Sequence, residues 1–164
     1  MKEWTGIEIQ RAKQGLEQAA AVALGQMLFE FARLDMALGL VLVWSDGGKQ
    51  LDKLTKAVTD LSFHKRLDLL HSFVATLYPV GNGARVLYDA WLKDAHSVRL
   101  VRNELVHGRW GVDPMKDQVF NVVGLPTSPN QQTKGYAVSE LKDIVAQMGL
   151  LQHRLSVLRT EWPV

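Results

Sequence analysis

Apolar residues recur at steps of three and four along most of this chain, and that periodicity restricts the fold to one built mainly from amphipathic α-helices. The first and longest periodic segment covers about residues 14–44 and ends at the turn sequence Asp46-Gly47-Gly48. It predicts one long helix with a single apolar side. The residues expected on that side are Leu24, Leu28, Phe31, Leu38 and Leu42.

The same periodicity predicts the other helices. A short helix is expected at residues 51–58, and a second long helix begins near Ser62, a suitable N-cap residue. The third long helix runs roughly over residues 83–107. The last helix covers residues 139–161, with Ser139 as its expected cap.

Between the third and fourth long helices the pattern changes to short β-branched or aromatic runs, at residues 109–112, 119–123 and 136–138. They predict an antiparallel element of two or three strands within residues 108–138, with the polar segment 125–132 as its tip. The predicted fold class is therefore all-α, a four-helix bundle with a small antiparallel β-hairpin insertion between the third and fourth long helices.

A chain of 164 residues is long enough for one helical domain, residues 1–164, with its own core. The formal net charge is only +2, so any nucleic-acid contact must come from a local patch. There are no cysteines, which excludes disulfide scaffolds, thiolate zinc sites and cysteine nucleophiles.

The sequence also bears on location. The longest apolar run, residues 36–44, is well short of a membrane span. The first residues lack the charged-then-apolar pattern of a signal peptide. We therefore expect a cytoplasmic protein with no membrane partner.

The segment Arg102-Asn103-Glu104-Leu105-Val106-His107-Gly108 carries the most chemistry. An arginine can bind a phosphate through two parallel hydrogen bonds, and a histidine can move protons near neutral pH. Both lie at the expected end of the third long helix, where Gly108 is well placed as a C-terminal stop. No Gly-rich phosphate loop, nucleophile elbow or zinc-peptidase motif is present in the sequence.

Two charged residues fall on the apolar sides of their helices when residues are placed at about 100° intervals. Arg102 lies between Val98 and Leu105, and Asp35 occupies the equivalent position in the first helix. Because a buried charge is tolerated when it is paired, we expect Asp35 and Arg102 to form an ion pair, or each to face a crevice. Glu30 is the second candidate partner of Arg102.

His107 lies about 140° around an ideal helix from Arg102, so the two side chains cannot point the same way from an intact helix. Either the helix frays before Gly108 and His107 turns round, or a second copy of the chain completes the pair. Both alternatives predict a composite site at a dimer interface.

Arg102-Asn103-x-x-x-His107 resembles the R-polar-x-x-x-H motif of HEPN domains (higher eukaryotes and prokaryotes nucleotide-binding). The Leu34-Asp35 step and the stretch from Arg102 to Trp110 are also similar to a bacterial branch of these proteins. The likeness extends loosely over residues 20–160, and the motif is its specific part.

The resemblance implies a homodimeric helical bundle that acts as a metal-independent endoribonuclease, often as a toxin or phage-defence component with an antitoxin partner protein. His107 would be the acid/base group, Arg102 would orient the scissile phosphate, and Asn103 would fill the polar position. Attack by the ribose 2′-OH would then cut single-stranded RNA and spare DNA. The alternative is a non-catalytic HEPN-like module for dimerisation or for RNA or protein binding. An unrelated structural protein would instead have a buried, hydrogen-bonded His107 and no cleft nearby.

Arg99 and Arg109 are candidates for RNA binding beside the motif, together with Lys116. Trp110 could stack on a base or could anchor the hairpin to the bundle. No cofactor is expected.

Metal binding is not expected either. His64 and His71 lie seven residues apart in the second long helix and lack a third ligand. His96, on the outer side of the third long helix, is interpreted as an exposed histidine.

Overall fold

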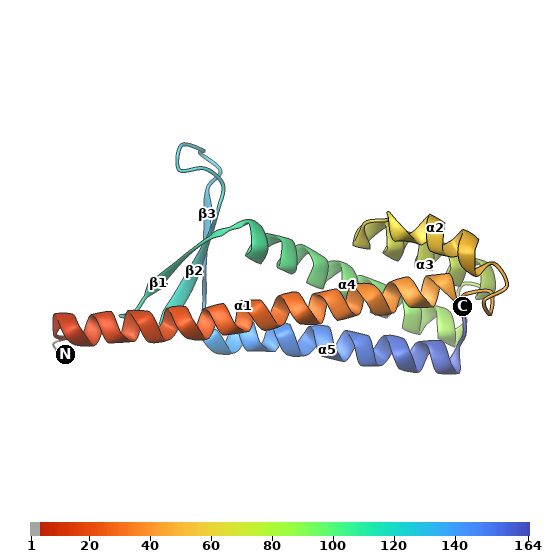
Figure 1. The fold of residues 1–164 in the computed structure, drawn as a ribbon, viewed down its shortest axis with the longest axis horizontal. Coiled ribbons are helices and arrows are strands. Elements are labelled where there is room, and N and C mark those ends of the chain that lie inside the picture. Colours follow the sequence, from red (N-terminus) through yellow and green to blue (C-terminus); the bar gives the residue numbers. More distant parts are fainter. Residues whose placement is uncertain (1–3) are drawn as a thin grey trace. The chain divides into compact units, whose positions relative to one another are not determined.

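The computed structural model describes residues 4–164, which form five helices and a small antiparallel sheet (Figure 1). Within this range, no helix is both long and apolar enough to cross a membrane. The helices are α1 (Gly6–Val43), α2 (Leu51–Thr59), α3 (Phe63–Leu77), α4 (Gly83–His107) and α5 (Val138–Glu161). The strands, all between α4 and α5, are β1 (Arg109–Asp113), β2 (Gln118–Val123) and β3 (Gln132–Tyr136).

The predicted mainly helical fold with a small sheet is confirmed, and two helix starts differ from the prediction. Helix α1 begins earlier than expected, because Thr5 and Glu8 form a capping box. The Glu8 carboxylate accepts from the Thr5 backbone N–H at 2.9 Å, and the Thr5 hydroxyl accepts from the Glu8 N–H at 3.3 Å. In α5, Ser139 is not the cap. The helix already includes Val138, and the Glu140 carboxylate accepts from the N–H of Ala137 at 2.7 Å.

The sheet is a meander in the order β1-β2-β3, with Trp110 opposite Asn121 and Val119 opposite Tyr136. The third strand was expected at residues 136–138 and lies instead at Gln132–Tyr136. This strand is polar and exposed over its first four residues, so it lacks the alternation by which a half-buried strand is recognised.

The chain divides into two compact units, to both of which α1, α4 and α5 contribute. One unit contains the described part of α1 up to Phe29 together with residues Val101–Ala146, and therefore the end of α4 and the sheet. The other contains Glu30–Leu100 and Gln147–Val164, and therefore α2 and α3.

The core of the second unit includes Trp91. This side chain is fully buried, and its indole Nε1 donates to the carbonyl of Leu151 at 2.9 Å. Leu34 and Leu38 of α1 are also fully buried, whereas Leu28, expected on the apolar side, is 48% exposed. The predicted line therefore holds at Leu38 and Leu42, whereas earlier in α1 the buried residues include Ala23 and Met27, one position before Leu24 and Leu28.

Tyr88 gives the second unit a testable pH dependence. Its hydroxyl donates to the carbonyl of Trp162 at 2.9 Å, and burial, followed by the nearby Tyr78, raises the pKa of Tyr88 to about 12. An unfolded tyrosine ionises near pH 10, so this group stabilises the fold fully below pH 10 and the contribution is lost as the pH rises through 12. The size is on the order of 2 kcal/mol.

We expect urea unfolding to show this loss between pH 10 and pH 12 in the wild type and a shallower loss in Tyr88→Phe. At pH 8 the variant should be about 1 kcal/mol less stable, because the Trp162 carbonyl loses its donor. Parallel stability curves for the two proteins would contradict the assignment.

Candidate functional site

The predicted motif occupies the last turns of α4, and the helix is intact there. The backbone N–H of Gly108 donates to the carbonyl of Glu104 at 3.1 Å, so the helical hydrogen bonding continues past His107. His107 is exposed and Arg102 is half-buried. Nη1 of Arg102 donates to Oδ1 of Asn103 at 3.1 Å. The alternative in which the helix frays before Gly108 is therefore wrong.

Glycine is required at position 108 because of a close contact and not because of a left-handed backbone conformation. It does not have the left-handed backbone of a typical C-terminal stop. Instead, the side-chain amide of Asn121, from β2, lies directly against its α-carbon, and a Cβ at this position would overlap that amide. Asn121 is buried, and its amide makes no hydrogen bond with the described residues. Close approach of β2 to the helix end therefore requires glycine here.

Two aromatic residues of the sheet fix the last turn of α4. The Trp110 indole Nε1 donates to the carbonyl of Leu105 at 3.0 Å. The Tyr136 hydroxyl donates to Oε1 of Glu104 at 3.2 Å. The rings of Trp110 and Tyr136 lie 5.9 Å apart between centroids. Of the two interpretations of Trp110, the contacts support the anchor, because its N–H and part of its ring are already engaged.

The other basic candidates differ in accessibility. Arg109 is exposed, and its Nη2 donates to the carbonyl of Gly124 at 2.9 Å. Lys116 pairs with Asp113 in the β1–β2 turn at 3.4 Å. Arg99 is half-buried in α4. Their role in RNA binding stays a prediction.

A groove lies beside the sheet in the same unit as the motif. Its volume is about 540 Å³, and its lining comes from α1, β1 and β2. Lys13 and Glu17 provide its charged groups, while Trp110 and Phe120 provide its aromatic ones. None of the residues Arg102–His107 lines this groove. An unrelated structural protein was expected to bury His107, so the exposure of His107 counts against that alternative.

Asp35 has a partner other than the expected Arg102. Its Oδ1 accepts from Nη1 of Arg66, on α3, at 3.0 Å, and its backbone carbonyl accepts from the same nitrogen at 3.2 Å. The Asp35 side chain is 37% exposed, which fits a residue at the edge of the buried side rather than inside it. Glu30, the second candidate partner of Arg102, accepts from Gln152 at 2.8 Å.

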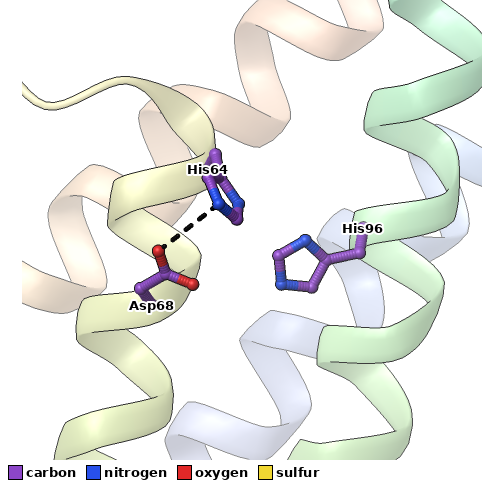
Figure 2. Close-up of side chains that lie close together, drawn as sticks. All are labelled: His64, Asp68 and His96. Carbon is purple, nitrogen blue, oxygen red and sulfur yellow. Dashed lines mark ion pairs between the residues drawn. The ribbon is translucent and has the colours of Figure 1, made fainter.

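A second cluster of polar side chains lies in the other unit. His64 and Asp68 are one turn apart on α3, and both point toward His96 on α4 (Figure 2). Nε2 of His64 lies 3.6 Å from Oδ2 of Asp68, and the two imidazole rings meet edge to face with centroids 5.4 Å apart. One nitrogen or oxygen from each residue lies within 4.8 Å of the others. His96 lies on a different helix, so the spacing of His64 and His71 within one helix does not predict the cluster.

The chain matches no family model, and comparison with curated proteins and with solved structures gives no match either.

Proposed function

We propose that the protein is a HEPN-like, metal-independent endoribonuclease that cuts single-stranded RNA as a homodimer. The observation that carries the proposal is the geometry of the motif. His107 is exposed at the end of an intact helix, while Arg102 is half-buried and held by Asn103 one residue along. An exposed imidazole and a fixed guanidinium are the two groups that this chemistry requires.

In the proposed reaction, His107 removes the proton of a ribose 2′-OH, and the oxygen attacks the adjacent phosphorus. The bond to the 5′-oxygen of the next nucleotide breaks, and that oxygen takes up a proton. The products are a 2′,3′-cyclic phosphate and a 5′-hydroxyl. Arg102 binds the phosphate and offsets the negative charge that develops on its oxygens in the transition state.

A single chain presents these groups in different directions, since they lie about 140° apart around the helix axis. With the fraying alternative excluded, we propose that the arginine of one copy works with the histidine of the other. A two-fold symmetric dimer would then contain two such sites. The groove in the same unit as the motif is lined by Phe120 and by the part of Trp110 that its anchoring contacts leave accessible, and it offers aromatic surface to bases.

We also propose a toxin or phage-defence setting with an antitoxin partner. A non-catalytic HEPN-like module for dimerisation or for RNA or protein binding is the second candidate. The bond from Arg102 to Asn103 favours it, because it uses part of the guanidinium within the chain.

Cleavage of matched single-stranded RNA and DNA of one sequence, with EDTA present, separates the two candidates. The nuclease is expected to cut the RNA, leave the DNA intact and produce 2′,3′-cyclic phosphate ends. Intact RNA after incubation with a dimeric, folded protein would support the non-catalytic module. Equal cutting of DNA would contradict the proposed chemistry.

A further inference from the structure

Helices α3 and α4 place three potential metal ligands together on the surface of the second unit. His64 and Asp68 come from successive turns of α3, and His96 faces them from α4 (Figure 2). His64 and Asp68 are exposed, and His96 is half-buried. The group is thus accessible to an ion from solvent, while its third member is held against the protein.

The neighbouring contact fixes the register of the two helices at this place. His71, two turns beyond His64 on α3, lies with its Nδ1 3.7 Å from Oδ1 of Asp89 on α4. Asp89 also accepts from Nε of Arg85, at 2.9 Å. Asp89 is therefore engaged by Arg85 and His71, and His64, Asp68 and His96 form a separate group.

An ordinary surface ion pair explains only part of this arrangement. A histidine and an aspartate four residues apart on a helix attract each other by a few tenths of a kcal/mol. That attraction involves only His64 and Asp68, and it does not account for the imidazole of His96, which meets that of His64 edge to face.

We propose that His64, Asp68 and His96 form a binding site for a divalent transition-metal ion of the zinc class. Two imidazole nitrogens and one carboxylate oxygen are a ligand set that suits Zn²⁺, Ni²⁺ or Co²⁺ and not Mg²⁺. Ligands of tetrahedral zinc lie about 3.3 Å from one another, so rotation of the exposed His64 and Asp68 side chains closes the present spacing of up to 4.8 Å. The fourth position stays open to water.

This site would join α3 to α4, so bound metal is expected to stabilise the unit that contains both helices. An ion that binds the folded chain at a hundredfold excess over its Kd should raise the Tm by about 5 °C or more. The effect is independent of the proposed ribonuclease, which lies in the other unit and works with EDTA present.

The test uses the full chain without a histidine tag. Thermal unfolding is followed with and without ZnCl₂, and the visible absorption of added Co²⁺ reports on imidazole coordination. His96→Ala and His64→Ala should lose both signals, and MgCl₂ should have no effect. The matched control is His153→Ala, which removes an exposed histidine of α5 in the same unit and should behave as the wild type.

Binding by the wild type that His96→Ala and His64→Ala abolish would support the site. No Tm shift in the wild type, or an equal shift in these variants, would overturn it. If His96→Ala does not fold, His96→Gln replaces it in the test. This variant keeps most of the side-chain volume, removes the imidazole and should also lose both signals.

Discussion

Replacing His107 by alanine is expected to lower the rate of RNA cleavage by about 10²–10⁴-fold, the usual contribution of a general acid or base. The change should leave the fold intact, because His107 is exposed in the last turn of α4. Initial rates on a single-stranded RNA and thermal unfolding of the same preparations measure both effects. A His107→Ala protein that cuts at the wild-type rate would contradict the assigned role.

The proposed dimer adds a stronger test. Arg102→Ala should also lose cleavage, and a mixture of the two inactive variants should recover it. If each site takes Arg102 from one copy and His107 from the other, a mixed dimer contains one intact site and one doubly damaged site. Random exchange in an equal mixture then gives about a quarter of the wild-type activity. No recovery from a mixture that is shown to exchange subunits would contradict the composite site, even if each variant alone is inactive.

Gly108→Ala is expected to destabilise the protein by about 3 kcal/mol, because the new methyl group overlaps the buried amide of Asn121, and this side chain or β2 must move to make room. For a chain of this size, that corresponds to a fall in Tm of about 6–12 °C. Urea unfolding at neutral pH gives the free energy directly.

The cause can be tested in a double-mutant cycle. In an Asn121→Ala background the amide is absent, so Gly108→Ala should cost less than about 1 kcal/mol. Asn121→Ala alone should have a small effect, because the buried amide has no hydrogen-bond partner among the described residues to lose. If Gly108→Ala costs the same in both backgrounds, the effect comes from the glycine backbone and not from the overlap.

Local signals explain how well the helices were predicted. The bounds of α4 and the cap at Ser62, whose hydroxyl accepts from Lys65, follow from residues adjacent in sequence. The Thr5-x-x-Glu8 pattern at the start of α1 is an equally local signal, and it accounts for the earlier start of this helix. The polar strand β3 has no such signal, because it is an exposed edge of the sheet.

Contacts between helices are harder to predict, because the periodicity within one helix does not give the distance to a residue of another. Asp35 was expected to pair with Arg102, which lies on the apolar side of its helix. Its partner is instead Arg66, whose long side chain reaches it from α3. A helical wheel gives the direction of a side chain but not its reach.

The cluster of His64, Asp68 and His96 also depends on contact between two helices, and one feature of the sequence predicts it. His64 and His71 are seven residues apart on one helix, and Asp89 and His96 are seven residues apart on the next. Antiparallel packing of two such helices brings both pairs into contact. The requirement for Gly108 had no comparable signal, since it depends on how closely β2 approaches the helix end.

The contacts that shape the end of α4 also span little of the chain. Trp110 bonds to Leu105 across 5 residues, and Tyr136 bonds to Glu104 across 32. Closing short loops costs little chain entropy, so these contacts can form early in folding, before the distant N-terminal helix finds its place in the same unit. The helix end that carries Arg102 and His107 thus takes its shape from a stretch of sequence that can order itself locally.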